Sequence, residues 1–390
     1  MSPETINNQP IYLDYHSTTP VDPRVAEKVL HYMTTAFGNA SSTDHVFGDK
    51  AAEAVSQASQ HLSKLVGASP QEIIFTSGAT ESINLALQGS IARSHDSCPR
   101  IAISPVEHKA VLDTCQELEK KGLAEIIYLH VDSQGRLDLN HLEQTCRNGI
   151  ALLGVMAANN EVGNIYPIEK IGHIARTYNV SFLCDASQAV GKIPINFAEW
   201  GITYLAVSGH KFYAPQGVGA LAVKRGSELE PIIFGGGHQK GLRSGTLNVP
   251  GIVGLGEACR LRQLEMEEDE SAIATKRDKL QNLLQERIPD LIVNGELHSR
   301  LAGNLHISIP GVPNSAVLAR VRHQLAISTG ASCSSGATAP SHVLRAMNLP
   351  EEWVDGALRL GLGKFTSDQE LERAAKILSE AVIQIYLLLD

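Results

Sequence analysis

The sequence lacks several features that would assign it to a specialised class of protein. Its longest apolar run, residues 150–158, is less than half of the roughly 20 residues that a membrane-spanning helix needs. Its first ten residues have no basic-then-apolar signal pattern. Basic residues are in the minority, with 33 Lys and Arg against 42 Asp and Glu and a net charge of −9. We therefore expect a cytoplasmic protein that binds neither membranes nor nucleic acid directly.

Cysteine is also sparse, and its spacing excludes further classes. No two of the six cysteines lie within four residues of each other, so the paired spacing of zinc ribbons and dithiol redox sites is missing. Six cysteines in 390 residues are too few for a disulfide scaffold. We expect no metal site, and each cysteine by default is a small buried hydrophobe. The six are Cys98, Cys115, Cys146, Cys184, Cys259 and Cys333.

What the sequence does contain is an alternation of short apolar runs with helical patterns. The runs include residues 72–76, 100–104, 181–184 and 204–208. Such alternation predicts an α/β fold whose central sheet is mainly parallel and covered by helices on both faces.

A change in composition near residue 250 suggests the domain organisation. We expect a large domain over 17–255 and a smaller α+β C-terminal domain over 256–390, with residues 1–16 packing on the smaller one. Residues 260–288 read as a long charged helix, whose acidic run 265–270 we expect to be a solvated face. Ser367 and Glu370 have the spacing of a capping box that begins a last helix.

Two polar residues that follow predicted strands are the first candidates for chemistry. Lys211 lies just after the strand at 204–208, where ligands bind in open α/β sheets. A lysine there is either a nucleophilic amine or an ordinary surface residue, and the motif alone does not decide. Asp185 comes directly after the strand at 181–184. It is either a helix cap or the partner of a cationic ring nitrogen such as that of pyridoxal phosphate. Both residues would face one crevice.

Four further segments offer anion contacts or a nucleophile. The turn 76–81 joins a strand to a helix and suits a phosphate, or is a plain helix cap. The glycine-rich stretch 235–246 is either a flexible tip or an anion contact. Cys333 lies among serines and glycines, where a thiol is accessible for nucleophilic work or simply free. Arg359, between apolar neighbours, needs a partner, which is either a substrate carboxylate or an internal salt bridge.

Taken together, these segments resemble the cysteine desulfurases of the class V aminotransferase group, which are fold-type I pyridoxal phosphate enzymes. The likeness runs from residue 12 to about residue 366, and the Cys333 segment is similar to the NifS/IscS-like branch. It also covers three further motifs, at residues 38–42, 107–110 and 159–163.

The resemblance assigns roles at the cofactor. Lys211 would hold it covalently and move protons, Asp185 would pair with the ring nitrogen, and Gln188 would hydrogen-bond the ring hydroxyl. His108 would stack on the ring and act as acid or base, with Asn160 nearby. The phosphate contacts would be Ala79, Thr80, Ser208, His210 and, from the neighbouring subunit of a homodimer, Thr246.

The resemblance also implies an activity. L-Cysteine, held by Arg359 and Asn39 beside Asn160, would become L-alanine, and Cys333 would carry the sulfur as a persulfide. A sulfur-acceptor protein of unknown identity, with an iron–sulfur scaffold among the candidates, would take the sulfur. A selenocysteine lyase or a cyst(e)ine C–S lyase remains an alternative, while a non-catalytic sulfur carrier is disfavoured because Lys211 and Cys333 are both present.

Two departures from the family pattern stand out. Ala40 occupies a position where relatives usually have proline, so the segment around Asn39 would be less rigid. The sequence ends at Asp390, soon after the last predicted helix, and we expect it to lack the tail with which relatives dock an iron–sulfur scaffold.

Overall fold

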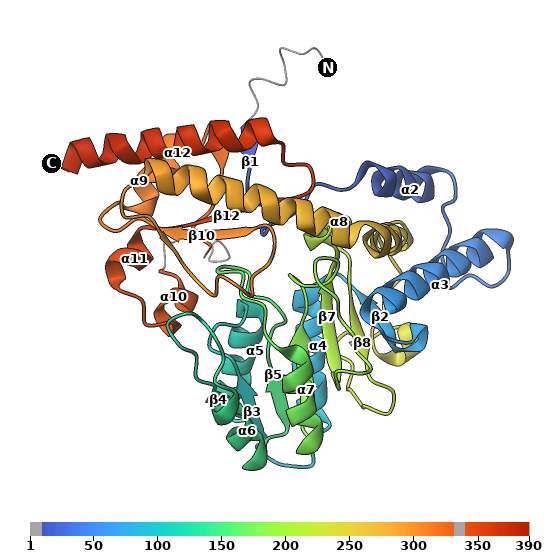
Figure 1. Cartoon of the computed structure of the whole chain (residues 1–390). Coiled ribbons are helices and arrows are strands. Elements are labelled where there is room, and N and C mark those ends of the chain that lie inside the picture. The colour runs from blue at the N-terminus through green and yellow to red at the C-terminus, as the bar shows by residue number, and fades with distance from the viewer. Residues whose placement is uncertain (1–9, 331–339, 390) are drawn as a thin grey trace.

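A seven-stranded sheet forms the centre of the protein. The computed structural model describes residues 10–330 and 340–389, and Figure 1 shows the sheet surrounded by helices. Only β8 runs antiparallel to its neighbours, so the sheet is mainly parallel, which confirms the predicted α/β fold. The strand order is β2 (Ile73–Thr76), β8 (Gly219–Val223), β7 (Tyr204–Ser208), β6 (Ser181–Asp185), β5 (Leu152–Gly154), β3 (Arg100–Ile103) and β4 (Glu125–Tyr128).

Both faces of this sheet are buried, because successive side chains of its inner strands enter different hydrophobic clusters. On β6, Phe182 and Cys184 join one cluster, whereas Leu183 joins the other. The same alternation occurs on β7, and it follows from the two-residue period of a strand. The surrounding helices are α4 (Ala79–Ala92), α5 (Lys109–Lys120), α6 (Leu139–Arg147) and α7 (Ile168–Thr177).

A third cluster joins the N-terminal segment to the C-terminal part of the chain. Ile11 and Leu13 pack with apolar residues from Ile273 onward. β1 (Ile11–Tyr12) pairs with β11 (Leu325–Ala326), and an antiparallel sheet has the order β12 (Ala357–Gly361), β10 (Asn304–Ser308), β9 (Ile292–Val293). The helices here are α9 (Asn314–Val321), α10 (His342–Ala346), α11 (Glu351–Asp355) and α12 (Asp368–Leu389). Ser367 and Glu370 form the predicted capping box.

One long helix, α8 (Val249–Arg287), runs just below α12 in Figure 1 and packs on α2 (Pro23–Thr34), α3 (Val46–Val66) and α12. It begins well before the predicted start at residue 260. Glycines in its first turns lowered the helix propensity of that stretch, but close packing requires them. A Cβ on Gly256 would lie 2.6 Å from the Cα atom of Ala58 on α3. The predicted division at residue 255 falls inside this continuous helix.

The acidic run on α8 is only partly the solvated face that the sequence suggested. Glu267 and Glu268 are exposed, but Asp269 and Glu270 turn toward Arg262, whose side chain is almost completely buried. Arg262 also donates from Nε to the carbonyl oxygen of Gly191 at 2.6 Å. Burial of an arginine needs such partners, so two acidic residues of the run serve the interior. In the described parts of the chain, no helix is both long and apolar enough to cross a membrane.

The start of α2 is tied to the C-terminal part of the chain through Asp22. The Asp22 carboxylate caps the helix by accepting from the Arg24 backbone N–H at 3.0 Å, and it also accepts from the Arg24 side chain. The Lys364 ammonium donates to the same carboxylate at 2.5 Å. Hydrogen bonds from Arg24 and then Lys364 hold the pKa of Asp22 well below its usual range.

This pairing predicts a pH-dependent contribution to stability. Asp22→Asn should lower the free energy of unfolding by about 2 kcal/mol at pH 7, because it removes the nearer of the two carboxylates that pair with the buried Lys364, the other being Glu265. A carboxylate with a depressed pKa stabilises the folded state above its unfolded pKa, so the difference should shrink as the pH falls below about 5. Urea unfolding of the wild type and the variant between pH 7 and about pH 3 measures this difference in the free energy of unfolding. A difference independent of pH would contradict the ion pair.

Candidate active site

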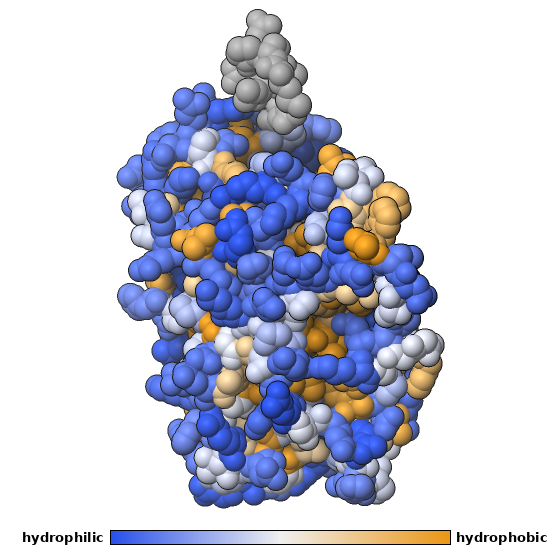
Figure 2. All heavy atoms as spheres, turned by 90° about the vertical axis from the view of Figure 1, so that its right-hand side faces the viewer, coloured by the Kyte–Doolittle hydropathy of each residue, from blue (hydrophilic) through white to orange (hydrophobic). Residues whose placement is uncertain are grey.

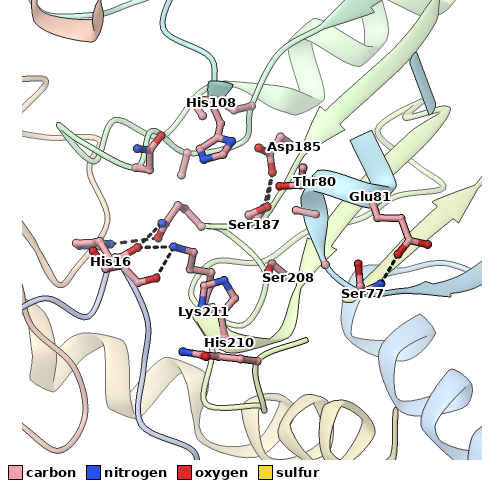
Figure 3. A pocket seen from close by; sticks show the side chains of 18 of the residues that line it. His16, Ser77, Thr80, Glu81, His108, Asp185, Ser187, Ser208, His210 and Lys211 are labelled. Carbon is pink, nitrogen blue, oxygen red and sulfur yellow. Dashed lines mark hydrogen bonds between the residues drawn. The ribbon is translucent and has the colours of Figure 1, made fainter. Parts of the chain in front are cut away.

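A pocket of about 570 Å³ opens where the carboxyl ends of three strands meet. β2, β6 and β7 point the same way, so their last residues share one edge of the sheet. Asp185 ends β6, Ser208 ends β7, and the turn after β2 leads into α4. All three contribute to the pocket lining (Figure 3). This is the position where open α/β sheets bind ligands.

Lys211 and Asp185 both line this pocket, as their sequence positions predicted. Lys211 ends the short helix η2 (Gly209–Lys211), and its Nζ atom donates to the carbonyl oxygens of His16 and Ser17, each at 2.7 Å. The Asp185 carboxylate accepts from the Ser187 backbone N–H at 2.9 Å and from its hydroxyl at 2.5 Å through the same oxygen, Oδ1. The pocket thus places an amine and a buried carboxylate around one cavity.

The turn into α4 forms a cradle for an anion. Ala79 and Thr80 are the first residues of the helix, where backbone N–H groups have no partner within the helix. A Cβ on Gly78 would stand 3.7 Å from Oγ of Ser208, so the glycine leaves the space beside that hydroxyl open. His210 closes this end of the pocket, and burial lowers the pKa of its imidazole to about 4.

His108 and Asn160 also line the pocket, and Figure 3 shows His108 across the pocket from His210. His108 caps α5, and its Nδ1 atom accepts from the Ala110 backbone N–H at 3.1 Å. Because Nδ1 accepts a hydrogen bond there, Nε2 is the nitrogen that carries the hydrogen of a neutral imidazole at this position. Asn160 follows β5 and lines the pocket, and its backbone oxygen accepts from Nη1 of Arg359 at 2.7 Å.

Arg359 has both an internal partner and a place at the pocket. The side chain is almost fully buried and donates from Nη2 to Asp14 at 2.9 Å and to the Ser17 hydroxyl at 2.8 Å. The sequence left open an internal salt bridge or a substrate contact, and the structure shows the salt bridge. The contacts with Asp14 and Ser17 use both hydrogens of Nη2, whereas Nη1 donates only once and Nε has no partner among the described residues, so the guanidinium retains two donors for a ligand.

Sequence reasoning assigned no role to several residues that shape the site. His16 and Ser17 line the pocket, and Asp14 holds Arg359, although their partners in the site lie between 172 and 345 residues further along the chain. Glu161 accepts from the Ser341 hydroxyl at 2.5 Å, and a Cβ on Gly330 would lie 3.3 Å from its carboxylate. Glu161 is thus bonded to Ser341 on one side of the segment that contains Cys333 and lies close to Gly330 on the other.

Of the thirteen predicted site residues, ten line the pocket, two lie outside its lining and one falls outside the described residues. The ten are Ala79, Thr80, His108, Asn160, Asp185, Gln188, Ser208, His210, Lys211 and Arg359. Asn39 and Thr246 are exposed and lie outside the pocket lining, and Oδ1 of Asn39 accepts from the Ser41 backbone N–H. Cys333 lies outside the described residues. The stretch 235–246 contributes no residue to the lining, but the guanidinium of Arg243 pairs at 2.8 Å with Glu81, which lines the pocket.

The comparisons with known proteins agree on one family. Residues 11–374 match the family model of class-V aminotransferases. "Cysteine desulfurase IscS" of Anaeromyxobacter dehalogenans is 44% identical over 96% of this chain and 92% of its own. A solved "NifS-like protein" superposes with a TM-score of 0.90, at 34% identity, over 96% of this chain and all of that one.

The chain belongs to the cysteine desulfurases of the class-V aminotransferase family. A third relative, solved as "SspA in complex with cysteine", has a TM-score of 0.81 and 32% identity over 92% of this chain and all of that one. Members of this family depend on pyridoxal phosphate.

The pocket of this cysteine desulfurase fits that cofactor. The open cradle at Gly78 and the start of α4 suit a phosphate. The buried Asp185 carboxylate suits a protonated ring nitrogen, and the Lys211 amine suits a carbonyl carbon. The pocket thus offers groups that match both the phosphate and the ring of the cofactor. Among the described residues there is no cluster of metal ligands.

None of the cysteines that the structure describes lines the pocket, and four of them are buried. Burial raises the pKa of the Cys115 thiol to about 12 and that of Cys146 to about 11, and it also raises the pKa values of Cys184 and Cys259. Cys98 is exposed. Because the thiolate is the reactive species, the four buried thiols are poor nucleophiles.

These environments predict the pattern of thiol labelling. Brief treatment of the native protein with iodoacetamide at pH 7.5, followed by peptide mass spectrometry, should modify Cys98 at least tenfold more than Cys115, Cys146, Cys184 or Cys259. Labelling after denaturation in guanidinium should remove the difference. Equal labelling of a buried cysteine and Cys98 in the native protein would contradict the packing described here.

Proposed function

We propose that this chain is a pyridoxal phosphate-dependent cysteine desulfurase that converts L-cysteine to L-alanine and moves the sulfur to Cys333. The observation that carries the proposal is the convergence of Lys211, Asp185 and His108 on one pocket. The relative solved in complex with cysteine supports the choice of substrate. Sulfur transfer to a thiol, rather than elimination, is what the names of the desulfurase relatives favour.

At the cofactor, three residues have distinct tasks. When bound, pyridoxal phosphate supplies an electron sink for the bonds around the amino acid's α-carbon. Lys211 holds the group covalently and, once released, carries a proton with its amine. Asp185 keeps the ring nitrogen protonated, because its buried negative charge favours a cation beside it. Gln188 binds the ring hydroxyl.

The phosphate end is held without a strong positive charge. Ala79 and Thr80 offer backbone N–H groups at the positive end of the α4 dipole, and Ser208 offers a hydroxyl. His210, with a pKa lowered to about 4, is neutral at pH 7 and contributes one N–H donor. This arrangement fixes the cofactor's position relative to Lys211.

The substrate end uses Arg359, Asn160 and Asn39 in this proposal. Arg359 binds the carboxylate of cysteine, with Asp14 and Ser17 fixing the guanidinium in place before the substrate arrives. Asn160, whose carbonyl also contacts Arg359, lies beside it. His108 exchanges a proton through Nε2, since Nδ1 is held by α5. Asn39 is outside the pocket lining and would have to serve from the rim or from a second subunit.

Cys333 takes the sulfur. Its thiolate attacks the sulfur of the substrate, an S–S bond forms, and the C–S bond breaks. The electron pair of that bond passes to the substrate's β-carbon, which takes a proton, so the products are alanine and a persulfide. Cys333 is three residues beyond Gly330, which lines the pocket, and three residues of chain span at most about 11 Å.

The persulfide would then pass its sulfur to an acceptor protein in the cytoplasm. Iron–sulfur cluster assembly is the destination that the IscS name of the relatives suggests. A reducing compartment suits an enzyme whose product is a thiol-bound sulfur. The acidic net charge disfavours nucleic acid as a direct partner.

The assignment of Lys211 and Cys333 is tested by following both products. Incubation with L-cysteine should yield alanine and add one sulfur, about 32 mass units, to the peptide that contains Cys333. Cys333→Ala should abolish the persulfide and lower alanine formation more than a hundredfold, because the nucleophile is lost. Lys211→Ala should abolish both products. Cys98→Ala is the matched control, since it removes an exposed thiol that is not part of the pocket lining.

Two outcomes would contradict this mechanism. Unchanged alanine formation in Cys333→Ala would show that Cys333 is not the acceptor. Pyruvate and ammonia in place of alanine would identify a C–S lyase.

We also propose that the enzyme is a homodimer in which Thr246 contacts the phosphate in the partner's site. Thr246 is exposed and outside its own pocket lining. Figure 2 shows apolar surface between polar regions on the face that carries α2 and α3. Exposed apolar side chains on or near these elements include Leu30, Met33, Phe37, Val46 and Phe47. An exposed apolar surface of this kind is typical of an interface between subunits.

Mixing two inactive variants tests this sharing. Thr246→Arg leaves Lys211 intact but would block the partner's phosphate site, whereas Lys211→Ala is inactive in its own site. After unfolding and refolding together, heterodimers should contain one complete site each, which restores about a quarter of the wild-type activity per subunit. Each variant refolded alone is the control. No recovery in the mixture, with heterodimers detected by native mass spectrometry, would place Thr246 in its own subunit's site.

The division into two domains remains part of the proposal. The separate hydrophobic cluster of Ile11, Leu13 and the residues from Ile273 onward supports a smaller domain over 256–390 that includes the segment 1–16. The large domain over 17–255 would then hold the cofactor, and the smaller one would supply Arg359 and Cys333.

A further inference from the structure

A lysine that no proposed step uses lies directly behind the pocket. Lys192 follows β6, is partly buried, and donates from Nζ to Oε1 of Gln188 at 3.0 Å. Among the described residues it forms no ion pair. Shielding an ammonium from water without a carboxylate in contact is unfavourable. The contact through which its charge reaches the pocket is the hydrogen bond to Gln188, which lines it.

That partner, Gln188, has its amide orientation fixed from both ends. Oε1 accepts from Nζ of Lys192 and from Nδ1 of His16, the latter at 3.2 Å. Nε2 donates to the backbone oxygen of His16 at 2.9 Å. An ammonium has no acceptor and a carbonyl has no donor, so the amide cannot be reversed. Oε1 therefore accepts two hydrogen bonds and Nε2 donates one. The second hydrogen of Nε2 remains available to a ligand in the pocket that Gln188 lines.

Lys192 is one of several charged or titratable side chains around this corner of the pocket. Burial lowers the pKa of the Lys192 ammonium to about 7, against an opposing contribution from Glu270. Its charge in turn disfavours protonation of His16 and His210. The charged or titratable neighbours, from every element packed here, are His16, His210, Lys211, Arg262, Glu270 and Arg359.

We propose that Lys192 is a positioning residue that acts through Gln188, making its amide a strong N–H donor that favours the anionic form of the cofactor's ring hydroxyl. A cation on the carbonyl oxygen polarises the amide and strengthens the donor at its nitrogen. The positive charge itself also favours a negative charge on the far side of Gln188. An anionic hydroxyl favours protonated Lys192 in return, so the two charges support each other once the cofactor is bound.

This inference rests on the proposed cofactor site, and it predicts how the bound chromophore titrates. The form of the chromophore that has lost a proton carries one more negative charge, and Lys192 favours that form. Removal of the Lys192 charge should therefore raise the pH midpoint at which the visible absorbance changes. One charge at this range, partly screened by solvent, should shift the midpoint by about one pH unit.

The experiment compares reconstituted wild type with Lys192→Met, Lys192→Arg and Lys192→Gln. Visible spectra recorded from pH 5.5 to pH 10 give the midpoint for each protein. Lys192→Met should raise it by about one unit, Lys192→Gln should raise it less because an N–H donor remains, and Lys192→Arg should keep it near the wild-type value. Lys120→Met, which removes an exposed lysine of α5, is the matched control and should shift nothing.

Melting temperatures of the cofactor-free proteins identify any variant that does not fold, and the remaining variants then carry the comparison. A midpoint in Lys192→Met and Lys192→Gln equal to that of the wild type would overturn the proposal. Equal shifts in the Met and Arg variants would also overturn it, because packing alone would then explain them. A wild-type protein that acquires no visible band with pyridoxal phosphate would instead refute the cofactor site, and the role of Lys192 with it.

Discussion

The shared direction of β2, β6 and β7 is the constraint on which the rest of the site depends. Because these strands end at one edge, a helix start, a carboxylate and a lysine arrive at one cavity although more than 130 residues separate them in the chain. The strands are buried on both faces, so their register is strongly fixed. A slip of one residue in β6 would turn Asp185 away from the ligand and bury a charge in the core.

The N-terminal segment completes the cavity from the other side. His16 and Ser17 offer backbone oxygens to Lys211, and Asp14 and Ser17 hold Arg359. The same few residues thus contact the proposed cofactor lysine and the proposed substrate arginine. β1 anchors them by pairing with β11, beyond which lies the segment that contains Cys333. The geometry of both ends of the reaction therefore depends on a short piece of chain that is itself held by the C-terminal part.

Much of this arrangement could be predicted from the sequence because it is local. Lys211 and Asp185 follow apolar runs directly, so their place at a strand end needs no knowledge of the rest of the chain. The contacts of Asp14 and His16 could not be predicted in this way, since their partners lie 345 and 172 residues away along the chain. The start of α8 was placed too late because propensity weighs glycines against a helix, whereas packing on α3 demands one at Gly256. Cys333 stays a prediction, supported by the position of Gly330.

The burial of four thiols has a consequence for a protein that handles reactive sulfur. A persulfide passes its outer sulfur to whichever thiolate reaches it first. Cys115, Cys146, Cys184 and Cys259 are enclosed and kept protonated, so they do not compete for that sulfur. The fold therefore keeps the transferred sulfur from reacting with these four buried thiols. Of the described cysteines only the exposed Cys98 stays accessible, so the four buried thiols do not divert the sulfur from its acceptor.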